Sequence, residues 1–193
     1  MKLRRSIVLL FVFSSFTFCN YSNAASFEKY APKLLKFEGS GYGIHKPVWG
    51  EKDFSKSEAL RILRKEYWDR YHGDLFRSQA VAEVFIDHMI NAGPGKYAQN
   101  IKAFEAIIGV TQDGTLSEED VLKANCFYFD EQLVNPYVKY RVLYYKSRPN
   151  SSEYPGWITR ATAFMVRNPY GLIELKDVRL PDSLRRKFQH IKL

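Results

Sequence analysis

The 193-residue sequence contains little cysteine, and this scarcity excludes two classes of protein. Cys19 and Cys126 are the two cysteines, and Cys19 lies in a segment that we expect to be removed. Because a lone cysteine forms neither an internal disulfide nor a metal cluster, disulfide-stapled domains and cysteine-ligated zinc domains are excluded. Cys126 lies in an aromatic run, which predicts a buried, small apolar side chain.

The sequence also lacks an apolar run of about 20 residues, the length of an ordinary transmembrane helix. Its apolar run at 6–19 follows a basic start, residues 2–5, and precedes Ser22-Asn23-Ala24-Ala25. A basic start, a short apolar middle and small residues before the cleavage point are typical of a secretory signal peptide. We therefore expect cleavage near Ala24-Ala25, export to the periplasm or the medium, and no stable membrane span afterwards. A retained N-terminal anchor is the alternative.

Histidine is scarce too, and the spacing of the four histidines does not indicate a metal site. A zinc peptidase would need histidines and glutamates at helical offsets, whereas Asp87 and His88 are adjacent and diverge on a helix. We expect neither a metal nor another cofactor. The histidines are His45, His72, His88 and His190.

The sequence lacks a strong excess of positive or negative charge. The chain has 29 Lys+Arg and 21 Asp+Glu, and removing residues 1–24 lowers the formal net charge from +8 to +5, because it deletes Lys2, Arg4 and Arg5. The remaining basic residues are scattered among acids, so a nucleic-acid partner is not expected. We expect an exported monomer, and its moderate positive charge fits attraction to an anionic cell wall.

Helical spacing of apolar residues runs almost throughout the mature chain and predicts an all-α fold, with at most a short β or irregular segment at the site. Ser55 and Glu58 have the spacing of a capping box. The predicted helices cover 27–36, 55–68, 78–90, 96–108, a short stretch from 117, 127–146 and 158–166.

A soft boundary lies at 93–96, where glycine and proline cluster. We divide the chain into a signal peptide (1–24), an N-terminal lobe (25–94), a C-terminal helical lobe (95–170) and a basic tail (171–193). Arg185-Arg186-Lys187 in the tail is either a contact to the wall or membrane surface or an ordinary solvated segment.

Glu38 is the first candidate for chemistry. It ends an apolar helix, between Phe37 and Gly39, and three glycines within five positions follow it. A helix C-terminus and an apolar neighbour both favour the protonated form of a carboxyl group. A protonated carboxyl is what the general acid of glycoside cleavage requires. A solvated glutamate at a helix end is the alternative.

Several motifs occur in an order that resembles glycoside hydrolase family 108. They are Phe37-Glu38-Gly39-Ser40, Tyr42-Gly43-Ile44, Ala59-x-x-Ile62-x-x-x-x-Glu66-Tyr67-Trp68, Phe85-Ile86-Asp87-x-x-x-Asn91-x-Gly93, Asp113-Gly114 and Gly156-Trp157-x-x-Arg160. In that family a lysozyme-like N-acetylmuramidase domain precedes a small domain described as peptidoglycan-binding. The resemblance implies a lysozyme-like catalytic lobe, a peptidoglycan-binding-like C-terminal lobe, peptidoglycan glycan strands as the substrate, and Glu38 as the catalytic acid.

One departure from the family concerns the loop after Glu38. Only Ser40-Gly41-Tyr42-Gly43 separates Gly39 from Ile44, where the family has a longer segment that contains a threonine. A non-catalytic wall-binding or secretion-accessory protein, which kept the fold and lost the loop, is therefore the alternative function.

The remaining site candidates are a second carboxylate and substrate contacts. For the carboxylate we consider Glu51, Asp53 and Asp87. For substrate contacts we predict Ser40, Tyr42, Trp49, Asp87 and Asn91. Asp87 and Asn91 share one helix face, and a purely structural role is an equal alternative for both. Tyr71 and Trp68 are further groove candidates, but Tyr67 and Trp68 fit the core better, and Trp157 with Arg160 is expected to hold the C-terminal lobe together.

Overall fold

The computed structural model describes residues 24–42, 53–167, 171 and 173–193. The predicted signal peptide up to Asn23, together with His45, Trp49 and Glu51, therefore lies outside the described residues. Within the described part every secondary-structure element is a helix, so the all-α prediction is confirmed. None of the helices described there is both long and apolar enough to cross a membrane.

The chain runs through eight α-helices and six short 3-10 or π-helical turns over the described residues. The α-helices are α1 (Phe27–Glu38), α3 (Lys56–Leu63), α4 (Gln79–Ala92), α5 (Gln99–Ile108), α6 (Glu118–Ala124), α7 (Glu131–Lys146), α8 (Pro155–Thr162) and α9 (Asp182–Lys187). The short turns are η1 (Gly39–Gly41), η2 (Arg64–Asp69), η3 (Gly73–Leu75), η4 (Lys96–Ala98), η5 (Ser151–Glu153) and η6 (Leu175–Asp177).

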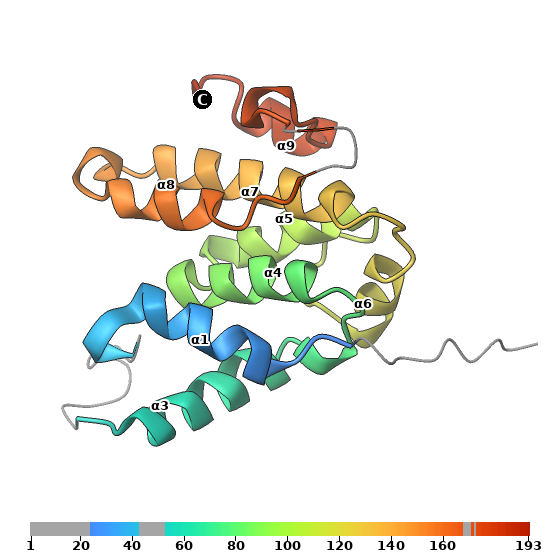
Figure 1. Cartoon of the computed structure of the whole chain (residues 1–193). Helices are drawn as coiled ribbons and strands as arrows, with labels where there is room; N and C mark the ends of the chain where they lie inside the picture. Colours follow the sequence, from blue (N-terminus) through green and yellow to red (C-terminus); the bar gives the residue numbers. More distant parts are fainter. Residues whose placement is uncertain (1–23, 43–52, 168–170, 172) are drawn as a thin grey trace, which may run out of the picture.

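Helix α4 is the centre of the molecule. It packs on α1 on one side and on α7 on the other, and α7 in turn carries α8 (Figure 1). All nine residues from Val81 to Met89 are buried. A helix that is buried nearly all round belongs in the interior, so the polar residues it carries there, Asp87 and His88, must find their partners inside the protein.

Serine caps fix where four helices begin. Ser26, Ser55, Ser78 and Ser117 each accept a hydrogen bond from a backbone N–H in the first turn of the following helix. At Ser55 the capping box predicted from the sequence is confirmed, because Glu58 also bonds back to the Ser55 backbone. These caps satisfy donors that a helix start leaves unpaired.

Helix α1 ends abruptly behind Glu38. Gly39 has φ 62° and ψ −148°, a conformation that only glycine adopts readily, and its N–H bonds to the Leu35 carbonyl. The chain then makes the single turn η1, and Tyr42 follows in the left-handed region with φ 53°. Glu38 is thus the last helical residue, with the backbone turning away immediately after it.

Helix α3 continues into a π-helical turn, η2. This wider turn places Trp68 in the core, where it has no exposed surface and stacks on Tyr30. Its indole N–H donates to Asp74 Oδ1 at 2.6 Å. The prediction that Trp68 is a core residue is confirmed. Single π-helical turns inside longer helices are frequently found at functional sites.

Three predicted boundaries differ from those observed. The helix predicted over 96–108 begins with the irregular turn η4, in which Tyr97 has φ 54°. Helix α7 starts at Glu131 instead of 127, and α8 covers 155–162 instead of 158–166. Pro155 explains the early start of α8, since proline is well suited to the first helical position.

The prediction that Cys126 is buried is wrong. Its side chain is exposed, directly after the end of α6, with Sγ 3.4 Å from the Leu122 carbonyl oxygen. Helix α6 ends there and α7 has not yet begun, so the aromatic run around Cys126 is a connecting segment. Tyr128 in the same run is 80% exposed.

A single cluster of buried residues runs across the boundary predicted at 93–96. It includes Leu34 of α1, Phe85 of α4 and Tyr137 of α7. The basic tail also joins it, because Leu184 and Phe188 are buried against the rest of the core. The buried core is continuous across the predicted boundary. The assignment of separate catalytic and peptidoglycan-binding roles to the two lobes stays a prediction.

Candidate active site

Glu38 faces an arginine from the far end of the sequence. Its Oε1 atom lies 2.6 Å from Nη2 of Arg160 in α8, and the two side chains are 15% and 9% exposed. The N–H groups of Arg160 do not point at Glu38 Oε1 as a hydrogen bond would require, so the contact between the two side chains is a close ion pair. Glu38 is largely buried and paired, which separates it from an ordinary solvated residue at a helix end.

Arg160 is itself held by Asp87, which is fully buried in α4. Nη2 of Arg160 donates to Asp87 Oδ1 at 2.8 Å, and Nε donates to Oδ2 at 3.0 Å. Asp87 also accepts from Nη2 of Arg141 at 2.7 Å and from the Tyr30 hydroxyl at 2.8 Å. We call Tyr30, Asp87, Arg141 and Arg160 the Asp87 cluster.

The electrostatics of the Asp87 cluster favour charged side chains despite burial. Burial by itself raises the pKa of Asp87, but the charge of Arg141 and the hydrogen bonds from Arg160 and Tyr30 outweigh it, so the pKa lies below its usual value. Burial lowers the pKa of Arg160, and the hydrogen bonds and charge of Asp87 together with the charge of Glu38 raise it overall. With Glu38 included, two guanidinium groups face two carboxyl groups, as buried charges require.

Two aromatic rings help to hold Arg160 in place, Phe37 by direct contact and Phe164 by packing on Phe37. Its guanidinium lies over the Phe37 ring, 5.0 Å from the ring centre. Phe37 in turn packs on Phe164, with 5.8 Å between ring centres. Phe37, which the sequence analysis treats as an apolar neighbour of Glu38, therefore also stabilises the arginine beside Glu38 by a cation–π contact.

Tyr67 borders the site from the π-helical turn. It is half-buried, and burial together with the nearby charges of Glu38 and Glu66 raises the pKa of its hydroxyl. The hydroxyl therefore keeps its proton at neutral pH and is available as a hydrogen-bond donor near Glu38. The sequence favours a core role for Tyr67, because its spacing continues the apolar face of the helix, and the residue does pack against the buried core.

Asn91 lies at the end of α4, one turn after Asp87. It is partly exposed, and its Oδ1 accepts a hydrogen bond from the Tyr145 hydroxyl at 2.6 Å. Tyr145 is buried and its ring packs against Trp157. Asn91 therefore connects the site to the aromatic residues at the start of α8.

The predicted site residues fall into three groups. Glu38 and Asp87 are brought together by Arg160, and Asn91 lies on the next turn. Ser40 lies in η1 and Tyr42 just after it, where Tyr42 is partly exposed. Asp53 is exposed ahead of α3, and Trp49 and Glu51 lie outside the described residues. Asp87 has no exposed surface, so in this arrangement it acts on its surroundings through Arg160 rather than by direct contact with a ligand.

Sequence reasoning missed the cations of the Asp87 cluster. The sequence predicts that Arg160 holds the C-terminal lobe together, and the structure shows that it also pairs with Glu38 at the end of α1. Arg141 was not considered, although it lies four residues after Tyr137 and four before Tyr145 on the buried face of α7. A cation at an inward helical position requires a buried carboxylate as partner, and tertiary packing supplies Asp87.

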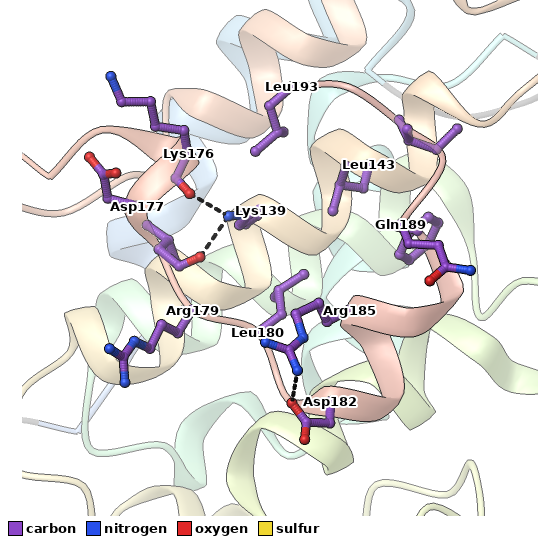
Figure 2. A pocket seen from close by; sticks show the side chains of 13 residues that line it. Lys139, Leu143, Lys176, Asp177, Arg179, Leu180, Asp182, Arg185, Gln189 and Leu193 are labelled. Atoms are coloured by element: carbon purple, nitrogen blue, oxygen red, sulfur yellow. Dashed lines mark hydrogen bonds and ion pairs between the residues drawn. The ribbon is translucent and has the colours of Figure 1, made fainter.

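A cavity lies away from Glu38, between α7 and the C-terminal segment. It has a volume of about 650 Å³ and is lined by α7 and the C-terminal segment, including Lys139, Leu143, Lys176 and Arg185 (Figure 2). The Lys139 ammonium donates to the backbone oxygens of Lys176 and Val178, and burial lowers its pKa. Lys139 therefore anchors the tail. No group of metal-ligating side chains is found in the part of the chain that the structure describes.

Comparisons with known proteins support the resemblance over part of the chain. The model of the family described as Glycosyl hydrolase 108 matches residues 31–93, about a third of the chain, and this segment includes Glu38, Tyr67 and Asp87. Residues 94–193, with Arg141 and Arg160, lie outside the match. No curated protein matches the chain.

Among solved structures, the chain is similar to SagA of Brucella abortus. The TM-score is 0.58 and the sequence identity 23%, with 72% of this chain and 90% of the SagA chain covered. At this identity the similarity shows a shared fold.

Proposed function

We propose that this protein is an exported peptidoglycan hydrolase, an N-acetylmuramidase that cleaves the β-1,4 bond between N-acetylmuramic acid and N-acetylglucosamine, with Glu38 as general acid. One observation carries the proposal. Within the segment that matches a glycoside hydrolase family, Glu38 ends its helix at a glycine turn and is held by Arg160. A carboxyl group fixed at the edge of an open turn is what proton donation to a glycosidic oxygen needs.

In the proposed mechanism Glu38 donates its proton to the oxygen of the leaving sugar. Arg160, 2.6 Å away, stabilises the carboxylate that remains. Asp87 binds Arg160 through two nitrogen atoms and so holds the guanidinium beside Glu38. Tyr67 is placed to donate a hydrogen bond near the same carboxyl group, and Ser40, Tyr42, Trp49 and Asn91 are proposed to contact the sugars.

The remaining parts of the proposal rest on the sequence. Residues 1–24 would direct export and be removed, leaving a monomer with a net charge of +5 that is attracted to the anionic wall. The segment 95–170 would help to bind peptidoglycan. Because Asp87 is fully buried, Glu51 and Asp53 are the candidates that remain for activating water or stabilising the oxocarbenium-like transition state.

A second candidate function is supported by the short loop after Glu38. Four residues separate Gly39 from Ile44, so a wall-binding or secretion-accessory protein without catalysis has a specific basis in the sequence. Such a protein would sediment with sacculi and release no reducing ends.

Zymography on purified peptidoglycan tests the proposal. We expect clearing by the wild-type protein and none by Glu38→Gln, which keeps the size of the side chain and removes its acid. Glu28→Gln, an exposed substitution in the same helix, is the matched control and should clear like the wild type. Equal clearing by wild type and Glu38→Gln would refute the role of Glu38, and no clearing by the wild type would favour the second candidate.

A further inference from the structure

An exposed aromatic ring lies at the start of α8. Tyr154 is 46% exposed and stacks on Trp157, with 4.4 Å between ring centres and 13° between ring planes. Trp157 is partly buried and packs against Tyr145, 5.7 Å away, which is 2% exposed. The three rings thus lead from the core to the surface, and Tyr154 is the outermost. We call Tyr145, Trp157 and Tyr154 the aromatic step.

The aromatic step is held in place before any ligand arrives. The backbone N–H of Trp157 donates to the backbone carbonyl of Tyr154 at 3.1 Å, and Pro155 between them fixes the start of the helix. Below them, the Tyr145 hydroxyl donates to Asn91 at 2.6 Å. A ring held by stacking and by the backbone loses little conformational entropy when a ligand binds.

The aromatic step adjoins the Glu38 site. Trp157 and Arg160 are three residues apart in α8, so their side chains are neighbours on the helix surface. Arg160 contacts Glu38, and Asn91 follows Asp87 by one helical turn. In Figure 1 the start of α8 and the end of α1 lie at the same end of the molecule.

We propose that the aromatic step is a sugar-binding subsite, in which a pyranose ring of the glycan strand stacks on the outer face of Tyr154. The flat face of a pyranose carries axial C–H groups, which pack well on the electron-rich face of an aromatic ring. A strand bound there would continue into the Glu38 site past Arg160. The identity of the sugar polymer rests on the proposed function, whereas the stacking surface rests on the rings themselves.

Tyr128 provides a matched control, because it is another strongly exposed tyrosine with an aromatic partner. It is 80% exposed and its ring lies 4.5 Å from that of Phe129, but the two rings meet edge to face, at 89°. Tyr128 lies ahead of α7, and none of its observed contacts leads to Glu38 or Arg160. Replacement of Tyr128 removes a comparable exposed ring without touching the proposed subsite.

The test measures binding of soluble peptidoglycan oligosaccharides of at least four sugars, by calorimetry, in the Glu38→Gln background, so that cleavage does not intervene. We expect Tyr154→Ala to weaken binding about tenfold, or ~1.4 kcal/mol, whereas Tyr154→Phe keeps the ring and stays within about twofold of the parent. Tyr128→Ala is expected to bind like the parent. Circular dichroism confirms that each variant is folded.

The possible results separate the subsite from the proposed function. Binding that Tyr154→Ala leaves unchanged overturns the subsite and leaves the proposed hydrolase standing. Binding that depends on Tyr154, together with a wild-type protein that releases no reducing ends, supports the subsite and overturns the hydrolase. No binding by the parent protein overturns both.

Discussion

At the residue scale, Arg160 contacts two carboxyl groups at once, those of Asp87 and Glu38. It bonds to Asp87 through Nε and Nη2, and the same Nη2 approaches Glu38. A planar guanidinium can serve two carboxyl groups in fixed directions, which the single ammonium of lysine cannot reproduce. The position of the Glu38 carboxyl group is therefore set by Asp87 through Arg160, although Asp87 itself is out of reach of solvent.

This arrangement predicts that Arg160→Lys retains the fold and loses activity. We expect at least a tenfold drop in kcat on peptidoglycan, because lysine keeps the positive charge but cannot hold Asp87 and Glu38 together. Steady-state release of reducing ends measures kcat, and Arg185→Lys, in an exposed ion pair with Asp182, is the control. A variant with wild-type kcat would contradict a positioning role for Arg160.

His88 is a second residue whose burial has a measurable consequence. Its Nδ1 lies 3.0 Å from the Tyr137 hydroxyl, which donates its own proton to the Asn100 carbonyl. Nδ1 must then carry the proton, and Nε2 is a buried acceptor with no hydrogen-bond partner among the described residues. Burial, with added repulsion from Arg141 and Arg160, holds the pKa of His88 well below its ordinary value of 6.5.

We therefore predict that the protein loses stability as the pH falls below about 6.5. The unfolded chain takes up a proton on His88 there and the folded chain does not, so acidification favours unfolding by up to ~1.4 kcal/mol per pH unit. Urea unfolding between pH 7.5 and 5 measures the slope, and His88→Phe should reduce it. An unchanged slope in His88→Phe would contradict the buried, neutral histidine.

The sequence predicts the site residues that carry a local signal, and it does not predict those that depend on tertiary contacts. Glu38 is predicted because it ends a helix before a glycine-rich turn, and Asn91 because it lies four residues after Asp87 on one helix face; both signals are local. Arg141 and Arg160 act through contacts to α4 and α1, which no local pattern specifies. The spacing of Arg141 showed that it faces inward, but the identity of its partner depends on tertiary packing.

At the scale of elements, the turn between η2 and α4 is fixed by the close approach of the Gly73 backbone to the Trp68 ring. A Cβ atom on Gly73 would lie 2.3 Å from the Trp68 ring. Trp68 cannot easily move, because it bonds to Asp74 and stacks on Tyr30. Glycine at position 73 is therefore required by packing and not by a positive φ.

Gly73→Ala is predicted to lower the free energy of unfolding by about 1–3 kcal/mol, the usual cost of overpacking a core. Gly156→Ala is the matched control, since the residue is helical and, beyond its chain neighbours and its own helix backbone, no atom of the described residues lies within 4 Å of the added Cβ. We expect that control to be neutral or slightly stabilising. Chemical denaturation compares the two, and equal stabilities would argue against the tight Trp68–Gly73 contact.

The helix starts that a serine caps are predicted well, whereas the starts of α5, α7 and α8 are not. Serine caps act within one turn, so the starts of α3 and α4 follow from Ser55 and Ser78 alone. The exposed segment at Cys126 was misread because an aromatic run resembles a buried helix when only its composition is considered. Helix α9 was read as a tail, although Leu184 and Phe188 anchor it in the core.

At the scale of the whole molecule, the Asp87 cluster ties four helices together. Tyr30 comes from α1, Asp87 from α4, Arg141 from α7 and Arg160 from α8. The helices of the two predicted lobes therefore share one buried charge network as well as one apolar core. Removing the central carboxylate leaves two buried guanidinium groups with Glu38 as their remaining acid.

Asp87→Asn is accordingly predicted to destabilise the protein by about 3–5 kcal/mol at neutral pH, the usual cost of breaking a buried ion pair. Because the pKa of Asp87 lies below 3.8 in the folded state, its contribution is present above that pH and is lost as the pH falls through the folded value. The variant should therefore show a weaker loss of stability in acid. Denaturant unfolding from pH 7 to 3 tests both statements.

Asp182→Asn is the control for that experiment. Asp182 forms an exposed pair with Arg185, and such pairs contribute about 0–1 kcal/mol. If Asp87→Asn were no more destabilising than Asp182→Asn, the Asp87 cluster would not hold the helices together as described.

The central claim, that Glu38 donates a proton to a glycosidic bond of peptidoglycan, is tested most directly by identifying the new reducing ends. Purified peptidoglycan is incubated with the protein, reduced with borohydride, and the reduced amino sugars are quantified. The account predicts reduced muramic acid with the wild-type protein and with Glu28→Gln, and at least a thousandfold less with a folded Glu38→Gln variant. Equal amounts from wild type and Glu38→Gln, or reduced glucosamine in place of muramic acid, would contradict it.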